Sequence, residues 1–261
     1  MNPRIVEIIK MNINNIRGIW RLKQIQKYFF NKSLLFPKLR TCNICNWSGR
    51  RFLDDNWLKK IRCPKCKLSE RHRLLLFSLQ NFSFIDKKIL HFGPEHFLIS
   101  HFNYNQTNYF TADLKRDDVD LNLDISNMNS IQNEEYDLII ASDILEHVLD
   151  DQKAIKEMYR ILKVGGRAIV TVPQKDDLDT TIEDLTNLSV KEREKKFGVS
   201  DHYRIYGLDI KDKFKKAKFH VEIFDSNCVS YKIRKKFVLS PPILGKHPMV
   251  TNYRKIYHAI K

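Results

Sequence analysis

Short apolar runs alternate with amphipathic stretches through the second two-thirds of the chain. From residue 87 onward, β-branched runs are followed by segments whose apolar residues recur at helical spacing. This alternation predicts a mostly parallel sheet with helices packed on it. The strands are expected at Lys88–Phe92, Tyr109–Asp113, Asp120–Leu123, Tyr136–Ala141, Arg167–Val172, His220–Phe224 and Lys255–Ala259.

The clearest unit of this pattern is residues 136–173, YDLIIASDILEHVLDDQKAIKEMYRILKVGGRAIVTVP. It predicts a buried strand, a polar loop, a helix over Asp151–Leu162 that Gly165-Gly166 ends, and a second buried strand. Another helix is expected over Leu208–Ala217. The polar loop follows the carboxyl end of a strand, where open α/β sheets bind ligands. We therefore expect the functional site at this edge of the sheet.

The first 86 residues follow a different pattern and divide into three parts. Residues 1–40 are basic and have apolar residues at roughly helical spacing, which predicts a helix. Such a helix either packs on the main domain, which we favour, or lies on a membrane surface as a peripheral contact. Residues 41–67 hold four cysteines, residues 68–86 predict a linking helix, and residues 87–261 form the predicted α/β domain.

Two C-x2-C pairs, Cys42/Cys45 and Cys63/Cys66, are separated by seventeen residues. Two such pairs can deliver four thiolates to one tetrahedral zinc ion. Four protein sulfurs leave no open position, so this zinc would be structural. A reducing compartment disfavours a disulfide, and a thioredoxin-like redox site is disfavoured because neither pair opens a βαβ unit. The lone Cys228 is interpreted as an ordinary small side chain.

The chain of 261 residues is strongly basic, with a formal net charge of +15. This charge favours an anionic partner, such as nucleic acid, a membrane surface or a phosphorylated substrate, or it reflects only a lysine-rich surface. No apolar run reaches the roughly 18 residues of a spanning helix. The N-terminus also lacks the features of a signal peptide. We therefore expect a cytoplasmic protein.

Candidate ligand-binding residues follow the first three predicted strands. Gly93 gives a tight turn after the first strand, without a G-x-G-x-x-G motif. Asp113 ends the second strand, where a doubly wound domain places an acid on a ribose. Asp124 and Ile125 follow the third strand, where an acid could receive an adenine amino group. A helix cap or a turn is the alternative role for Asp113.

These segments together resemble the class I S-adenosylmethionine-dependent methyltransferases of the type 11-like group. More narrowly, they resemble a bacterial subgroup with an N-terminal zinc ribbon. The resemblance covers about residues 41–224 and implies a Rossmann-like seven-stranded sheet of order 3-2-1-4-5-7-6, with an antiparallel seventh strand. It is carried by CNICNW, CPKCKLSERHRLL, KILHFGPE, YFTADL, LDISNM, YDLIIASDILEHVLDD, YRILKVGGRAIVTVP, TIED and FGVSDHYRIYG.

The resemblance implies that S-adenosyl-L-methionine is the cofactor and assigns residues to its parts. Gly93 and Glu95 would lie beside the methionine part, Asp113 on the ribose, and Ser142 at the sulfonium end. The residues expected to bind the cofactor are Gly93, Glu95, Asp113, Leu114, Asp124, Ile125 and Ser142.

Methyl transfer to a hydroxyl or an amine requires the acceptor to lose a proton, which a histidine or a carboxylate can take. His147 follows the fourth strand, and His202 lies in a loop after the fifth. Local packing and anchoring of the loop are their alternative roles. The expected catalytic residues are His202, His147 and Asp201, and the expected substrate-binding residues are Glu183, Asp184, Arg204 and Tyr206.

The expected reaction is methyl transfer to an oxygen or nitrogen atom of a small-molecule, glycan or lipid-linked acceptor. One alternative is an RNA methyltransferase that uses the zinc ribbon and the basic runs at residues 211–218 and 232–236. Nucleic acid is not the favoured partner, because few aromatic residues interleave these runs. A second alternative is a non-enzymatic binding module, against which Asp113 and Asp124 argue.

Overall fold

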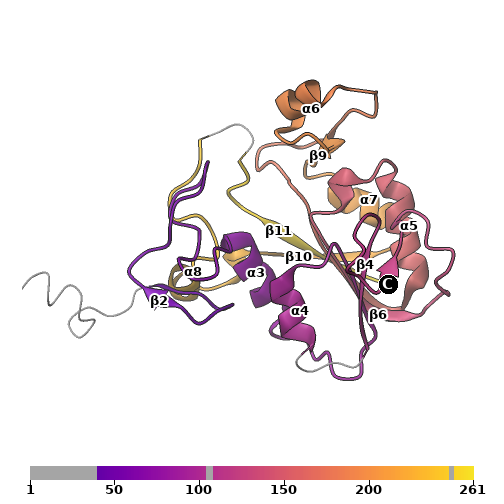
Figure 1. The fold of residues 1–261 in the computed structure, drawn as a ribbon, viewed down its shortest axis with the longest axis horizontal. Helices are drawn as coiled ribbons and strands as arrows, with labels where there is room; N and C mark the ends of the chain where they lie inside the picture. The colour runs from indigo at the N-terminus through magenta and orange to yellow at the C-terminus, as the bar shows by residue number, and fades with distance from the viewer. Residues whose placement is uncertain (1–39, 104–107, 247–249) are drawn as a thin grey trace, which may run out of the picture.

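The structure of the chain, a computed structural model, describes residues 40–103, 108–246 and 250–261 (Figure 1). Its larger part is an α/β domain, and a smaller module with the four paired cysteines lies beside it. The predicted basic helix over residues 1–40 and its membrane contact lie, apart from Arg40, outside the described residues. No helix in the described ranges is long and apolar enough to cross a membrane.

Seven strands of the described chain form one sheet, in the order β5-β4-β3-β6-β7-β11-β10. Strand β11 runs antiparallel to both of its neighbours, and all other pairs in the sheet are parallel. Counted along the chain within this sheet, the order is 3-2-1-4-5-7-6, which confirms the predicted fold class. The strands are β3 (Ile89–Phe92), β4 (Tyr109–Asp113), β5 (Leu121–Asn122), β6 (Tyr136–Ser142), β7 (Leu162–Thr171), β10 (His220–Asp225) and β11 (Lys255–Ile260).

Helices and two short hairpin-like pairs of strands surround this sheet. The helices are α3 (Glu70–Leu79), α4 (His96–Asn103), α5 (Asp151–Ile161), α6 (Val190–Phe197), α7 (Ile210–Lys216) and α8 (Tyr231–Phe237), with 3-10 turns η1 (Leu145–His147) and η2 (Ser226–Cys228). The short strands are β1 (Arg40–Thr41), β2 (Ser48–Gly49), β8 (Ile182–Glu183) and β9 (Arg204–Ile205). They pair as β1 with β2 and β8 with β9, both antiparallel.

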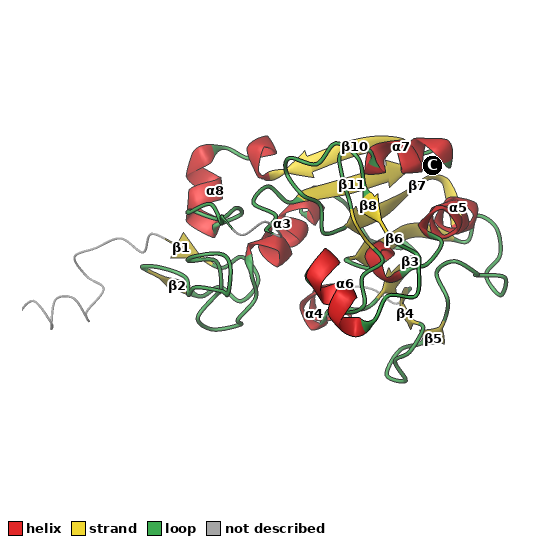
Figure 2. Cartoon of the chain, turned by 90° about the horizontal axis from the view of Figure 1, so that it is seen from above, coloured by secondary structure: helices red, strands yellow, loops and turns green. Residues whose placement is uncertain are grey.

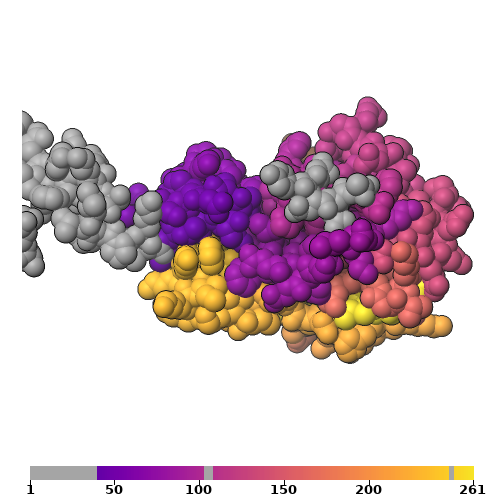
Figure 3. Space-filling model, turned by 90° about the horizontal axis from the view of Figure 1, so that it is seen from below, coloured from indigo at the N-terminus to yellow at the C-terminus, as the bar shows by residue number. Residues whose placement is uncertain are grey.

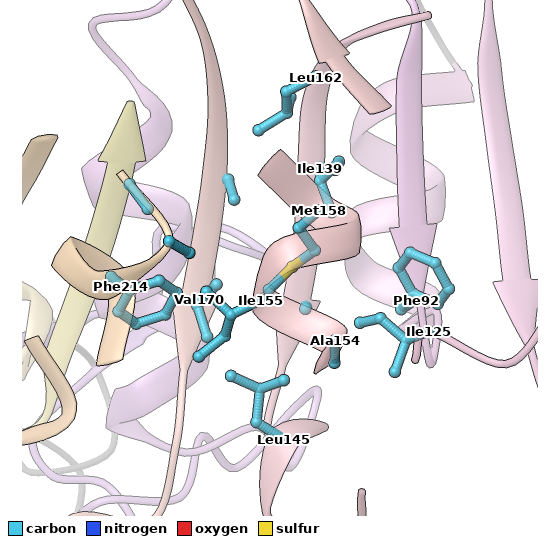
Figure 4. Close-up of a cluster of buried hydrophobic side chains, with 14 of the residues drawn as sticks. Phe92, Ile125, Ile139, Leu145, Ala154, Ile155, Met158, Leu162, Val170 and Phe214 are labelled. Atoms are coloured by element: carbon cyan, nitrogen blue, oxygen red, sulfur yellow. The ribbon is translucent and has the colours of Figure 1, made fainter. Parts of the chain in front are cut away.

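Both faces of the large sheet are covered, which explains the continuous apolar runs in its central strands, such as residues 138–141 of β6 and 168–170 of β7. Leu90, Ile139 and Val170 belong to a buried cluster that includes the apolar side chains of α5 and α7 (Figure 4). Ile89 and Ile140 belong to a second cluster with apolar residues of α3 and α4 on the opposite face. Successive residues of a strand therefore serve alternate layers of the core.

Helix α5 begins where the Asp150 carboxylate accepts a hydrogen bond from the Lys153 backbone N–H. It ends at Ile161, because Leu162 already has extended backbone angles and opens β7. The prediction that Gly165-Gly166 ends this helix is therefore wrong. The two glycines lie inside β7, and Gly165, with φ +77°, occupies a strand irregularity where its N–H donates to the Lys261 carbonyl.

Arg73 of α3 joins the cysteine module to the rest of the chain. Its side chain is fully buried. The guanidinium donates to the carbonyls of Leu68, Ile61 and Val238 at 3.0, 2.7 and 3.0 Å. It also lies 4.3 Å from the centre of the Phe52 ring. One side chain thus binds the module to α3 and to the segment after α8, which Figures 2 and 3 place next to the module.

Shortening a buried side chain of α5 should measurably lower the free energy of unfolding. Ile155 is completely buried beneath the sheet, so Ile155→Ala leaves a cavity and should lower the free energy of unfolding by about 2–5 kcal/mol. Denaturant titration followed by circular dichroism measures the change. Val190→Ala, at an exposed helical position, should shift the free energy by less than about 0.5 kcal/mol. Equal effects of the two substitutions would contradict this assignment of the core.

Candidate active site

Two cavities open at the carboxyl ends of β3 and β6. The strand order reverses between these two strands, because β4 and β5 follow β3 on one side while β6 and β7 extend the other. Such a switch point is where open α/β sheets bind ligands. The larger cavity has a volume of about 960 Å³ and the smaller one about 680 Å³. They meet at residues that line both, namely Gly93, Asp143, Ile144, His147 and Asp201.

The smaller cavity brings together four of the predicted cofactor residues: Asp113, Leu114, Asp124 and Ile125. Both acids also brace their own turns. Oδ1 of Asp113 accepts a hydrogen bond from the Lys115 N–H at 2.8 Å, and Oδ1 of Asp124 accepts from the N–H of the residue two positions on. The turn role of both acids is therefore observed, and it is compatible with a ligand role because each turn holds its carboxylate at the cavity wall.

Gly93 lies at the junction of the two cavities and has a φ of +56°. A Cβ atom at this position would lie 2.5 Å from Cδ1 of Ile144. Both the positive φ and the lack of space for a Cβ atom favour glycine at this position. The chain can therefore turn sharply here without placing a side chain in the junction. Gly93 therefore keeps the passage between the two cavities open.

Glu95 and Ser142 line the larger cavity close to the junction. The Ser142 hydroxyl donates to the Glu95 carboxylate at 3.3 Å and shares a hydrogen bond of 3.1 Å with Thr171. Burial raises the pKa of Glu95 to about 7. All seven predicted cofactor residues thus line one cavity or the other, around a single opening.

Sequence reasoning missed the two arginines in the larger cavity, Arg71 and Arg254. Both pair with the Asp143 carboxylate, Arg254 through an Nη1 to Oδ1 distance of 2.9 Å. Arg71 comes from α3 and Arg254 immediately precedes β11, so they are far apart in the sequence. The charged residues at the start of α3 could have indicated a site role for Arg71, whereas nothing in the local sequence marks Arg254.

The cysteine module supplies part of the wall of the larger cavity. Asp55, Trp57 and Leu58 line it from the loop between the two cysteine pairs, and Leu68 lines it just after the second pair. The module therefore forms part of the larger cavity at the carboxyl edge of the sheet.

Glu146, His147 and His202 form a compact group at the junction (the junction cluster). One ligand-type atom from each lies within 4.8 Å of the others. The two imidazole rings are 4.7 Å apart and nearly perpendicular. Burial raises the pKa of Glu146 to about 7 and lowers the pKa of His202 to about 4. Nδ1 of His147 lies 3.2 Å from the carboxylate of Asp201, so the three predicted catalytic residues lie together.

The structure does not bring the four predicted substrate-binding residues into either cavity. Arg204 is completely buried and donates to the carbonyls of Leu145 and Leu149, both at 2.8 Å. The same guanidinium binds Glu183, at 2.5 Å. These bonds hold η1 and the loop after β6 in place. Because η1 contains Glu146 and His147, Arg204 helps to position the junction cluster.

The other two members of that set also have internal partners. The Tyr206 hydroxyl is buried and donates to the Asp151 carboxylate at 2.8 Å. Asp184 binds the Thr186 backbone N–H and the Lys196 ammonium. Polar residues after β7 resembled site residues in the sequence, but their side chains bind other protein groups instead of facing either cavity.

The four paired cysteines lie in a geometry that fits a metal ion. Sγ of Cys42 lies 3.7 Å from that of Cys66, and Sγ of Cys45 lies 3.6 Å from that of Cys63. Tetrahedral zinc with bonds of about 2.3 Å requires sulfur separations of about 3.8 Å. No disulfide joins them. The four sulfurs therefore fit one tetrahedral zinc ion.

Comparison with known proteins points to one activity class. The model of a family described as a methyltransferase domain matches residues 95–170. None of the curated proteins compared matches the sequence.

Among solved structures, the chain is similar to several methyltransferases at low identity. An S-adenosylmethionine-dependent methyltransferase from Mesorhizobium loti is 12% identical over 73% of this chain and 98% of its own, with a TM-score of 0.50. One from Archaeoglobus fulgidus is 13% identical over 74% and 95%, with a TM-score of 0.49. Phosphoethanolamine N-methyltransferase 2 from Haemonchus contortus, in complex with S-adenosyl-L-methionine, is 15% identical over 73% and 52%, with a TM-score of 0.46. At this identity, only the Mesorhizobium loti likeness is informative, and it shows a shared fold.

The cysteine geometry predicts about one zinc ion per purified chain. The double variant Cys42→Ser/Cys63→Ser removes one sulfur from each pair and should lose the metal, as measured by inductively coupled plasma mass spectrometry. Cys228→Ser is the matched control, because that thiol is exposed and belongs to neither pair. Zinc retained by the double variant would contradict the four-sulfur site.

Proposed function

We propose that the protein is an S-adenosylmethionine-dependent methyltransferase acting on an oxygen or nitrogen atom of a small-molecule, glycan or lipid-linked acceptor. The observation that carries this proposal is the meeting of two cavities at one switch point. One cavity has the side chains expected for a nucleoside, and the other is larger and faces the same opening. A methyl donor and an acceptor must meet in this way.

The smaller cavity fits the nucleoside part of the cofactor. The carboxylate of Asp113 would bind the ribose hydroxyls, and Asp124 and Ile125 would flank the adenine, with Leu114 beside them. Gly93 leaves space at the junction, where Glu95 and Ser142 would hold the methionine part. When bound, the sulfonium of S-adenosylmethionine supplies a methyl group that is open to displacement.

The larger cavity is the proposed acceptor site. Its volume of about 960 Å³ is in the range of small-molecule sites. Arg71, Arg254 and Glu70 at its wall favour a polar acceptor over a purely apolar one. Trp57 and Leu58 add apolar contact from the cysteine module.

In the proposed reaction, a lone pair on the acceptor atom forms a bond to the methyl carbon while the carbon–sulfur bond breaks. The electrons of that bond stay on sulfur, which becomes a neutral thioether, and the acceptor atom loses its proton. His147, His202 and Asp201 lie where acceptor and methyl group would meet, which supports their proposed part in handling this proton. The protein mainly positions the two reactants and excludes water.

The proposed zinc ion is structural and takes no part in the reaction. Its four sulfurs leave no position for a substrate. It would stabilise the loop that carries Asp55, Trp57 and Leu58, and with it one wall of the acceptor cavity.

The two basic runs offer no comparable support for an RNA substrate. They lie on and next to α7 and α8, and none of their described residues lines either cavity. Lys213 is moreover bound to the Asp151 carboxylate, at 2.7 Å. The acceptor cavity therefore favours a small acceptor group over a nucleic-acid duplex.

Calorimetric titration should show one S-adenosylmethionine site per chain. Asp113→Ala should weaken binding by roughly 10- to 100-fold, because it removes a hydrogen bond to a charged group worth about 1.5–3 kcal/mol. Asp117→Ala is the matched control, since Asp117 lies in the same loop, is exposed and lines neither cavity. A native protein that binds no cofactor, or an Asp113→Ala variant that binds it normally, would sink the proposal.

The class of acceptor is tested with methyl-labelled S-adenosylmethionine and a fractionated extract of the cells that contain the protein. Label should enter the small-molecule, glycan or lipid fraction and should resist nuclease. The Asp113→Ala variant should transfer none above background. Label found in RNA would instead support the RNA methyltransferase alternative.

A further inference from the structure

We propose that the junction cluster of Glu146, His147 and His202 binds a divalent first-row transition metal ion, distinct from the zinc at the cysteines. The three side chains supply two imidazoles and one carboxylate, with their ligand atoms within 4.8 Å of one another. This donor set occupies one face of an octahedral ion and leaves the other positions open. The acceptor part of the inference rests on the proposed methyltransferase function.

Two atoms of the cluster have no hydrogen-bond partner in the described structure, although they are buried. These are Oε2 of Glu146, whose residue is 1% exposed, and Nδ1 of His202, whose residue is 8% exposed. A buried polar atom without a partner is costly, and a bound ion is one of the few ways to satisfy it. Both atoms belong to residues that line the larger cavity, so an ion could reach them from there.

Asp201 lies beside one ring nitrogen of His147, as a carboxylate often does when the other ring nitrogen binds a metal. Its carboxylate lies 3.2 Å from Nδ1 of His147. A histidine that binds a metal through one ring nitrogen typically gives the other to a carboxylate or carbonyl, which fixes the ring. Asp201 thus orients His147 and leaves its Nε2 for an ion.

The surrounding charges permit a cation. Arg71 and Arg254 lie near Glu146, but both are paired with the Asp143 carboxylate. Glu70 and Glu95 also line the same cavity. Around the whole cavity, six acids, Asp55, Glu70, Glu95, Asp143, Glu146 and Asp201, therefore outnumber the four lysine and arginine side chains, Arg62, Lys67, Arg71 and Arg254.

The location of the cluster gives the ion a function. His147 lines both cavities, so the open positions of the ion would lie where the acceptor meets the methyl group. Oxygen donors bind such ions readily, and a coordinated hydroxyl loses its proton more easily. The inference thereby selects an oxygen acceptor. With the ion bound, the two imidazoles act as ligands in place of the proton-handling part proposed above, and the acceptor's proton passes to solvent.

The test uses zinc-loaded full-length protein and Mn²⁺ as the probe, with free Mn²⁺ followed by electron paramagnetic resonance. The native protein should bind one Mn²⁺ per chain. Glu146→Gln and His147→Gln should each weaken binding by at least about tenfold, since even an outer-shell partner is worth 10- to 100-fold. Glu194→Gln and His220→Gln, at exposed positions, are the matched controls and should bind as the native chain does.

The His147 side chain is 37% exposed, so His147→Gln should leave the fold intact even where Glu146→Gln does not. Circular dichroism checks that the variant is folded. Relaxation of water protons should also increase on binding, since open positions at the ion hold water. No Mn²⁺ binding at millimolar concentration, or unchanged binding by both cluster variants, would overturn the site. Binding without enhanced relaxation would overturn the open positions.

The measurement is made without S-adenosylmethionine or acceptor. A failed cofactor titration would therefore leave the cation result intact, and a failed cation titration would leave the proposed function intact.

Discussion

The parallel pairing of β3 with β6 is the constraint on which the rest of the structure depends. Their register, from Ile89 opposite Leu138 to Phe92 opposite Ala141, makes the two strands end at the same level. Directly beyond these ends, Gly93 and Asp143 both have positive φ angles, +56° and +52°. The chain thus turns away from the sheet on each side of one gap, and both cavities open into it.

Much of this arrangement follows from the sequence, because apolar runs mark strands that are buried on both faces. The seven strands of the large sheet were predicted from these runs, and their order from the family resemblance. The residues proposed for the cofactor line the two cavities because position at the end of a strand is a local property. Arg254 was not found, since its place beside Asp143 depends on the path of the whole chain. Arg204 and Tyr206 were misplaced because sequence shows polarity but not the direction of a side chain.

Arg73 shows how firmly the cysteine module belongs to the main domain. Burying a guanidinium is costly unless its donors are satisfied, and here backbone carbonyls from three separate segments accept them. A loss of order in the module would remove the Ile61 carbonyl and the Phe52 ring from this buried charge. The stability of the module and that of the segment after α8 are therefore linked.

The two cavities are lined by different parts of the chain, and this has a consequence for the divergence of such proteins. The loop between the cysteine pairs lines only the larger cavity, with Trp57 and Leu58, whereas Asp113 and Asp124, at the carboxyl ends of sheet strands, line only the smaller one. Substitutions in that loop can reshape the space for one reactant while the pocket for the other stays unchanged. Under the proposed function, a lineage could thus acquire new acceptors through changes in the loop between the cysteine pairs alone.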